Sequence, residues 1–208
     1  MINTIIFDMG NVLIEWNPTR FIQEMEHDPA RQEKIVQAIF SSGIWEKQDD
    51  GSLSIAKACQ KSQALLDASY HQAIEQMYYY WQHYTTAHNE IQNYAVKLHQ
   101  LGYQLYVLSN TSRVYYTLKQ AGLLPIDQLL SGKILSFEEK IVKPDTQIYQ
   151  LLLKRYQLIP EQCVFLDDVP KNIEAAQKVN IHGLLVKNEQ QALHDLQALL
   201  KHQGKYGG

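Results

Sequence analysis

The sequence predicts an α/β fold in which a parallel, doubly wound sheet carries an inserted segment made only of helices. From residue 89 onward, short apolar runs bounded by turn residues alternate with stretches of helical periodicity, which is typical of a parallel sheet with helices on its faces. Between residues 15 and 88, helical patterns follow one another without a strand pattern between them. We therefore predict an α/β core, residues 1–14 and 89–208, and a helical cap, residues 15–88.

Length, charge and cysteine content exclude several classes of protein. The 208 residues, 45% of them hydrophobic, suffice for one compact domain or for a core with an inserted subdomain. A net charge of −3 gives no basic footprint for nucleic acid. No apolar run is long enough to span a membrane. Cys59 and Cys163 lack metal-ligand spacing, which favours buried thiols in a reducing compartment. We expect a cytoplasmic protein without a signal segment, either monomeric or dimeric.

The first predicted strand ends at a carboxylate. The apolar, largely β-branched run 5–7 stops at Asp8, and Gly10 follows in a stretch that can turn tightly. A carboxylate at the carboxyl end of a central strand lies where open α/β sheets bind their ligands. Asp8 considered by itself fits the start of a turn equally well.

The cap is predicted to contain four helices. Asn17 and Asp28 each precede a proline, which indicates an N-cap followed by proline at the first helical position. Two further helical patterns cover residues 55–66 and 70–84, after a break that contains two glycines and the adjacent acids Asp49 and Asp50.

The core then alternates between helices and strands. The predicted helices are 91–101, 112–121, 144–156, 170–179 and a last one that ends near residue 200; the predicted strands are 103–108, 128–131, 163–166 and 183–186. We expect the tail, residues 202–208, to be frayed.

Three of the later strands run directly into polar residues. These residues are Ser109 and Asn110, then Asp167 and Asp168, and finally Lys187. The stretch ILSFEEKIVKPD adds Lys143 between the first two groups. Because the strand ends meet at one edge of the sheet, we expect acids, a hydroxyl, an amide and a lysine to converge there. Such a set can bind a cation and a phosphate together.

Four short motifs around these residues resemble those of the haloacid dehalogenase-like hydrolases. They are DMGNV with Asp8, LSN with Ser109, VKPD with Lys143, and FLDDVPKN with Asp167, Asp168 and Asn172. The motifs occur in the family's order, and the resemblance spans nearly the whole chain. It implies a Rossmann-like core with an inserted cap. It also implies a magnesium-dependent phosphatase, as most members of that family are.

The resemblance assigns the phosphoryl chemistry to four residues. Asp8 would be the nucleophile that forms an aspartyl-phosphate. Lys143 would neutralise the nucleophile and the transferring oxygens, and Ser109 and the backbone amide of Asn110 would hold the phosphoryl oxygens. Without the other motifs, Ser109 reads equally well as a helix cap, and Lys143 as a solvated surface lysine.

The same resemblance places a magnesium ion beside the nucleophile. Asp8 and Asp168 would supply carboxylates, and Gly10 its backbone carbonyl, because Mg²⁺ takes oxygen ligands. Asp167 would hold a ligand water or orient the lysine, and Asn172 would point back toward the site. The paired acids also suit a helix N-terminus, although one acid is enough for that purpose. Asn172 also suits an ordinary polar position on a helix.

Gly10 departs from the family pattern. Most family phosphatases carry a second aspartate at this position, which protonates the leaving alcohol and activates water. The variant resembles a DLGNV subgroup that includes sugar-phosphate phosphatases acting on glucose 1-phosphate. Turnover is slow, or another group substitutes, or the leaving group needs little help; candidate substitutes are Glu15, Glu46, Asp49 and Asp50. We also expect the backbone of Gly10 to adopt a conformation that disfavours a β-carbon.

Three functions are compatible with the sequence. The favoured one is a metal-dependent phosphatase of small phosphorylated metabolites, with sugar phosphates foremost. The second is a metal-free dehalogenase of the same fold, against which the pair Asp167 and Asp168 speaks. The third is a catalytically impaired protein that binds a partner through the tyrosine-rich stretch 78–84.

Overall fold

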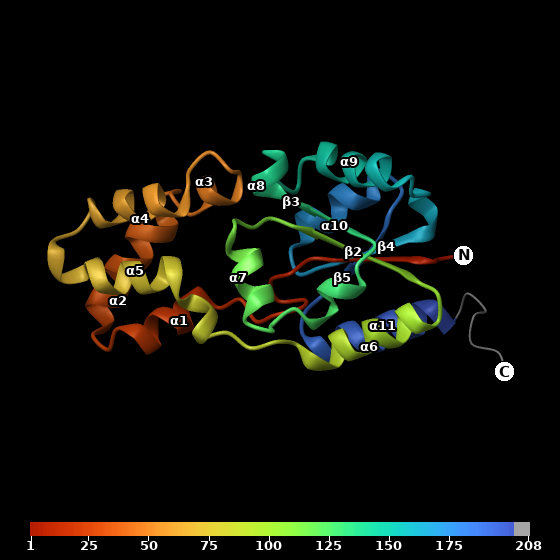
Figure 1. Cartoon of the computed structure of the whole chain (residues 1–208), viewed down its shortest axis with the longest axis horizontal. Helices are drawn as coiled ribbons and strands as arrows, with labels where there is room; N and C mark the ends of the chain where they lie inside the picture. The colour runs from red at the N-terminus through yellow and green to blue at the C-terminus, as the bar shows by residue number, and fades with distance from the viewer. Residues whose placement is uncertain (202–208) are drawn as a thin grey trace.

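The structure is a computed structural model that describes residues 1–201 (Figure 1). Five parallel strands form one sheet in the order β3-β2-β1-β4-β5. The strands are β1 (Thr4–Phe7), β2 (Gln104–Ser109), β3 (Gly132–Leu135), β4 (Cys163–Asp167) and β5 (His182–Leu185). The predicted α/β fold with a doubly wound parallel sheet is confirmed, and β1 is its central strand.

Helices cover both faces of this sheet. Side chains alternate along a strand, so Ile5 and Phe7 of β1 join one hydrophobic cluster and Ile6 joins the other. Helices α6 (Asn89–Gln100), α7 (Val114–Gln120) and α11 (Glu189–Lys201) pack against the first face, and α9 (Thr146–Tyr156) and α10 (Pro170–Gln177) against the second. Three shorter elements complete the core: η4 (Pro125–Leu129), α8 (Ser136–Glu139) and η5 (Pro160–Gln162).

Between β1 and α6 the described chain is helical, and we call residues 15–88 the helical insertion. Its elements are α1 (Pro18–Met25), α2 (Pro29–Val36), the π-helical turn η1 (Gln37–Ser41), α3 (Glu46–Asp49), α4 (Ile55–Gln63), η2 (Ala68–Tyr70), α5 (His71–Tyr79) and η3 (Trp81–His83). In Figure 1 it lies beyond the carboxyl ends of the strands, at the left of the view. Its status as a separate domain stays a prediction.

The first two helices of the insertion begin where the sequence predicts. The side chain of Asn17 accepts a hydrogen bond from the amide of Arg20 (3.1 Å), and that of Asp28 accepts one from the amide of Ala30 (2.9 Å). Each proline occupies the first helical position, where its missing N–H is not needed. Capping and proline together therefore fix both helix starts.

Three predicted features differ from the structure. The predicted break between the second and third helices of the insertion contains the short helix α3. The strand expected at 128–131 lies four residues later, at β3, because Pro125 begins a 3₁₀ turn that takes up Gln128 and Leu129. The apolar residues Leu129 and Leu130 before Gly132, and Ile134 and Leu135 after it, fit a strand equally well. Only the second stretch is hydrogen-bonded to β2. The helix expected at 70–84 is interrupted at Tyr80, where φ is −132°. The interruption turns Trp81 into the core.

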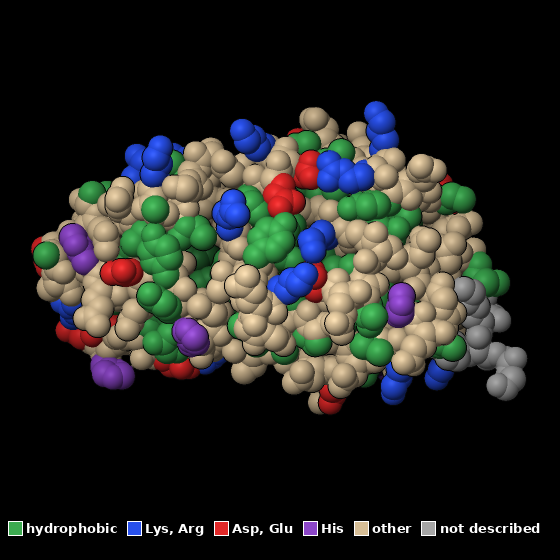
Figure 2. Space-filling model, viewed as in Figure 1, with side chains coloured by type: hydrophobic (Ala, Val, Ile, Leu, Met, Phe, Trp, Pro, Cys, Tyr) green, Lys and Arg blue, Asp and Glu red, His purple; other side chains and the backbone are tan. Residues whose placement is uncertain are grey.

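Two observations on the described residues concern membrane spans and surface charge. Among residues 1–201, no helix is long and apolar enough to cross a membrane. Figure 2 shows that Lys and Arg side chains are interspersed with Asp and Glu on the face in view. The predicted fraying of the tail, residues 202–208, falls outside the described residues.

Candidate active site

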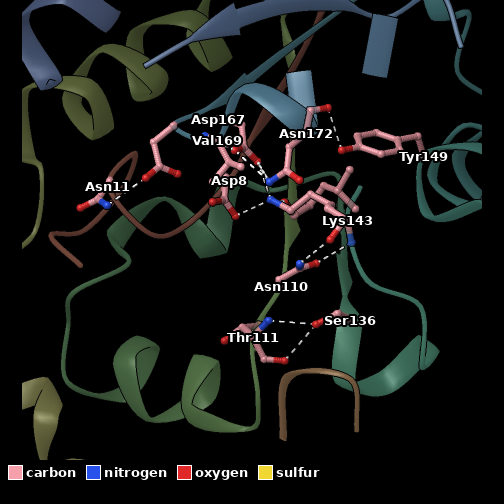
Figure 3. Close-up of polar contacts among 12 residues, drawn as sticks. Asp8, Asn11, Asn110, Thr111, Ser136, Lys143, Tyr149, Asp167, Val169 and Asn172 are labelled. Carbon is pink, nitrogen blue, oxygen red and sulfur yellow. Dashed lines mark hydrogen bonds and ion pairs between the residues drawn. The ribbon is translucent and has the colours of Figure 1, made fainter. Parts of the chain in front are cut away.

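The nucleophile candidate, Asp8, stands directly after β1. Its backbone amide donates to the carbonyl of Leu166 on the neighbouring strand β4 (2.9 Å). The chain then turns, and the carbonyl of Met9 accepts hydrogen bonds from the amides of Leu13 (2.9 Å) and Ile14 (3.1 Å). Strand pairing and this turn thus set Asp8 at the carboxyl end of β1, among the polar residues drawn in Figure 3. The helical insertion lies beyond these strand ends (Figure 1).

Lys143 is buried between two carboxylates. Its Nζ lies 2.8 Å from Asp8 Oδ1 and 2.6 Å from Asp167 Oδ2, and it also donates to the carbonyl of Leu108 (3.1 Å). Burial by itself lowers the pKa of this lysine, but the two carboxylates outweigh burial and raise it above its usual value. The ammonium therefore stays charged, although it is removed from water.

Asp167 is held on all sides. It is fully buried, and the Asn172 amide donates to both of its oxygens, at 3.0 Å each. The backbone amide of Val169 adds a third bond (2.8 Å), and the carbonyl of Asn172 in turn accepts from the Tyr149 hydroxyl (2.9 Å). Asp167 and Asn172 thus orient Lys143 from behind the site, as Figure 3 shows. From the sequence motif, Asp167 is expected either to hold a ligand water or to orient Lys143, and these contacts fit the second role.

The side chain of Asn110 fixes the backbone of Lys143. Its Nδ2 donates to the Lys143 carbonyl (2.9 Å), and its Oδ1 accepts from the Lys143 amide (2.8 Å). The peptide bond from Lys143 to Pro144 is cis. Asn110 and Thr111 line the cavity beside Asp8, whereas Ser109 is buried at the end of β2 and is not among its lining residues.

Asn11 joins the site without having been predicted. Its Nδ2 donates to Asp168 Oδ2 (2.9 Å), and its Oδ1 accepts from the amide of Trp16 (2.9 Å). The residue has a φ of +54°, a left-handed conformation in which asparagine is enriched. The sequence feature that could have pointed to Asn11 is an asparagine directly after Gly10 in a tight turn.

Three carboxylates meet at this point. Oxygens of Asp8, Asp167 and Asp168 lie within 4.8 Å of one another. Burial raises the pKa of Asp8 to about 6, with Lys143 opposing and Asp167 reinforcing the shift. Burial likewise raises the pKa of Asp168, opposed by the hydrogen bond from Asn11. Three acids face a single lysine, so a further cation would lower the electrostatic cost of the site.

A cavity of about 310 Å³ lies over these groups. The core side of its wall includes Asp8, Gly10, Asn110, Lys143 and Asp168. The opposite side comes from the helical insertion and includes Trp16, Phe40, Trp45, Glu46, Asp49 and Trp81. The insertion therefore closes over Asp8, and a bound molecule would contact both parts of the chain.

Comparison with known proteins decides the family. The model of the haloacid dehalogenase-like hydrolases matches residues 2–180. The chain belongs to the haloacid dehalogenase-like hydrolases. It is 35% identical over 100 residues, 48% of its length, to acyl-CoA dehydrogenase family member 10 of Mus musculus, and this match spans 9% of that protein. A second relative, bifunctional epoxide hydrolase 2 of the same species, is matched over 10% of its length.

Solved structures share the fold at low sequence identity. HAD family enzyme bt-2542 of Bacteroides thetaiotaomicron, in complex with magnesium and inorganic phosphate, is 20% identical, with a TM-score of 0.73 over 89% of this chain and 94% of that one. The L-2-haloacid dehalogenase of Xanthobacter autotrophicus is 16% identical, with a TM-score of 0.62 over 96% and 83%. At these identities the two structures show that the fold is shared.

In this haloacid dehalogenase-like hydrolase, Gly10 is not held in a special conformation. Its φ lies outside the left-handed region, and a β-carbon added there would lie 3.4 Å from Cβ of Trp16, an ordinary contact. The expectation that the backbone of Gly10 disfavours a β-carbon is wrong, because the residue with a left-handed conformation in this turn is Asn11.

The four acids that could substitute for the missing one have different surroundings. Glu15 forms an ion pair with Arg20 (2.7 Å) and does not line the cavity. Asp50 accepts from the amide of Ser52 (2.7 Å) and also stays outside the lining. Glu46 and Asp49 both line the cavity. The structure therefore brings two of the four to the site.

Proposed function

We propose that this chain is a magnesium-dependent phosphatase that hydrolyses small phosphorylated metabolites, with sugar phosphates foremost, through an aspartyl-phosphate on Asp8. The observation that carries the proposal is the cluster of Asp8, Asp167 and Asp168 around the buried Lys143. One edge of the sheet thereby combines acceptors for a hard cation with a fixed positive charge for phosphoryl oxygens.

The residues present fit a magnesium ion. Asp8 and Asp168 offer carboxylate oxygens, and Gly10, also in the cavity wall, offers its backbone carbonyl. Asp8 Oδ1 is buried and, among the described residues, has the ion pair with Lys143 but no hydrogen-bond partner. When bound, Mg²⁺ would supply positive charge to the transferring phosphoryl oxygens.

The protein's own groups supply the rest of the chemistry. Asp8, in its ionised form, attacks phosphorus, and the ester oxygen departs. Lys143 neutralises the charge that gathers on the phosphoryl oxygens, and its orientation is fixed by Asp167 and Asn110. Water then cleaves the aspartyl-phosphate and restores the Asp8 carboxylate.

The aromatic part of the cavity would receive the leaving group. Trp16, Trp45 and Trp81 present apolar ring surface opposite the carboxylates. A sugar ring has an apolar face of C–H groups that suits such surfaces, and its hydroxyls suit the few polar groups of the wall. This is why we favour sugar phosphates among small phosphorylated metabolites.

We also propose a cytoplasmic setting. Cys59 and Cys163 are free and buried, and free thiols persist in reducing compartments. Burial raises the pKa of Cys59 to about 11 and that of Cys163 to about 12, so both thiols are inert at neutral pH. Cell fractionation would test this setting, and recovery of the protein in an oxidising compartment would contradict it.

The test is a panel of phosphorylated metabolites, with glucose 1-phosphate and an aryl phosphate among them, assayed with Mg²⁺ and with excess EDTA. We expect phosphate release that requires Mg²⁺. A 2-haloacid is included in the same panel. Halide release that persists in EDTA would favour the metal-free dehalogenase, and no turnover of any compound would favour a partner-binding protein.

A further inference from the structure

The proposed function leaves one step without a group. The leaving oxygen must be protonated, and Gly10 has no side chain to do this. General acids contribute typically about 10²–10⁴-fold to such reactions. The question is which described residue in the cavity wall can hold a proton there, and the inference below rests on the proposed function.

Asp49 is held against the core. It is the last residue of α3, and its backbone carbonyl accepts a hydrogen bond from the Ser136 hydroxyl at the start of α8. The same hydroxyl accepts from the amide of Thr111 (2.9 Å), a residue of the cavity wall beside Asn110 (Figure 3). Asp49 is thus tied to the loop that lines the phosphoryl side of the cavity.

The neighbouring glycine confirms how closely the insertion approaches the core. Gly51 has a φ of +73°, and a β-carbon added to it would lie 2.3 Å from the carbonyl oxygen of Phe137. The backbone at 49–51 therefore lies directly on α8. Asp49 has a fixed place over the site, rather than a place on a solvated loop tip.

We propose that Asp49 is the acid–base residue of this enzyme and takes the place of the carboxylate absent at Gly10. Asp49 lines the same cavity as Asp8 but belongs to the helical insertion, which forms the side of the cavity opposite the carboxylates. Asp8 and Asp49 therefore face a bound ester from opposite parts of the chain.

The surroundings of Asp49 favour its protonated form. Burial raises the pKa of Asp49 to about 8; the charges of Glu46, Asp50 and Asp8 contribute to this shift, and a hydrogen bond from the Trp45 side chain opposes it. The remaining charged groups of the cavity wall are Lys143 and Asp168, on the core side. At neutral pH Asp49 carries a proton that it can give to a departing oxygen.

Each atom in the two steps is accounted for. A carboxylate oxygen of Asp8 bonds to phosphorus, the ester P–O bond breaks, and the departing oxygen takes the proton of Asp49 to leave as an alcohol. A water oxygen then bonds to phosphorus while Asp49 accepts one of its protons. The bond from phosphorus to Asp8 breaks, phosphate leaves, and both carboxyl groups return to their starting states.

Glu46 is the competing candidate. It lies almost one turn earlier in α3 and also lines the cavity, but it is exposed to solvent. The same test therefore includes both acids.

The experiment measures turnover of phosphate esters whose leaving groups span a range of pKa, from a nitrophenol to a simple alcohol, for the wild type and Asp49→Asn. We expect the wild-type rate to depend weakly on leaving-group pKa. The variant should lose less than about 10-fold on the best leaving group and about 10²–10⁴-fold on the alcohol. The alkaline decline of the wild-type rate on alkyl esters, caused by ionisation of Asp49, should be absent from the variant.

Asp50→Asn is the matched control, because it makes the same change one residue away, outside the cavity wall. We expect it to keep the wild-type dependence on leaving-group pKa, with the alkaline decline shifted to lower pH because the charge of Asp50 no longer raises the pKa of Asp49. The bond from Ser136 goes to the backbone of Asp49, so Asp49→Asn should fold normally, which its melting temperature reports.

Four outcomes would overturn the role of Asp49. One is an equal loss on all esters, which indicates a structural role. Another is a leaving-group-dependent loss in Glu46→Gln and not in Asp49→Asn. The third is that the wild type cleaves none of the esters, which would contradict both the proposed function and the role of Asp49 as an acid. Cleavage by the wild type with an unchanged slope in Asp49→Asn overturns the inference alone.

Discussion

The two walls of the cavity are built by different forces. On the core side, Lys143 is held by two ion pairs of 2.8 and 2.6 Å, and Asp167 by three further hydrogen bonds. On the insertion side, the ring of Trp16 packs against Trp81 with centroids 4.8 Å apart and against Trp45 at 5.4 Å. The first wall is polar, and directional hydrogen bonds and ion pairs hold its side chains in place. The second wall is apolar, and close packing of its rings holds them in place.

This difference assigns a task to each wall. Buried ion pairs are costly unless every partner is in place, so a network of this kind is suited to one invariant group, the phosphoryl. Hydrophobic contact with ring surfaces is non-directional and tolerates different shapes, so it suits the variable part of a substrate. Asp49 is the acid that the apolar wall contributes to the chemistry.

Breaking the polar wall should have the largest effect. Lys143→Met leaves three carboxylates without their buried cation, so we expect turnover to fall by about 10³-fold. Removing one partner of a buried pair also lowers the free energy of unfolding by about 3–5 kcal/mol. Denaturant unfolding in EDTA measures the second effect, and Mg²⁺ should restore part of the loss because it supplies positive charge.

Lys133→Met is the control for that change. Lys133 pairs with Asp127 at 2.8 Å, and Asp127 keeps a second partner in Lys119 at 2.6 Å. We expect its loss to cost less than about 1 kcal/mol. Equal destabilisation by the two substitutions would show that the cluster around Asp8 has no special electrostatic demand.

The link between the walls should give an intermediate effect. Asn11 bonds both to Asp168 and to the backbone of Trp16, so Asn11→Ala should weaken Mg²⁺ affinity by about 10-fold, as the loss of a group that orients a ligand does. The positive φ should cost Asn11→Ala a further ~1 kcal/mol of stability. Calorimetric Mg²⁺ titration and thermal unfolding measure the two effects.

Asn11→Gly separates the contributions. Glycine accepts the left-handed backbone but lacks the amide. We expect it to show the loss of Mg²⁺ affinity without the loss of stability attributed to the backbone. Wild-type affinity in Asn11→Gly would mean that Asp168 does not depend on Asn11.

Restoring the family's usual acid should have the smallest effect. The backbone accepts a side chain at Gly10, so Gly10→Asp should fold. We expect activity to stay the same or to fall by a few-fold, because Asp49 already supplies the proton and a further negative charge beside Asp8 is unfavourable. The measurement is turnover of an aryl and an alkyl phosphate. A large gain on the alkyl ester would mean that the wild type lacks a working acid.

The polar wall was more visible in the sequence than the apolar one. Asp8, Asp167 and Asp168 lie at the carboxyl ends of strands. Apolar runs and turn residues indicate where strands end, so the convergence of these acids could be predicted. The ties of Lys143 to Asn110 span 33 residues, and no local pattern reports such a pair. This is why Asn110 was expected to contribute only its backbone amide.

The helices of the insertion could be predicted from the sequence, but the residues of the insertion that line the cavity could not. The helices followed from periodicity and from the caps at Asn17 and Asp28. The choice among Glu15, Glu46, Asp49 and Asp50 depended on how α3 lies on α8, a contact between segments about 90 residues apart. The position of β3 was missed for a similar reason, since pairing with β2 selected one of two equivalent apolar stretches.

The most direct test of the central claim is to trap the covalent intermediate. Wild type and Asp8→Asn are mixed with an activated phosphate ester and Mg²⁺, quenched in acid during turnover, digested, and analysed by peptide mass spectrometry. We predict one phosphoryl group on the peptide that contains Asp8, located on that residue, and none in Asp8→Asn, which should also show no turnover. Turnover by the wild type with the phosphoryl group on another residue, or continued turnover by Asp8→Asn, would contradict the account.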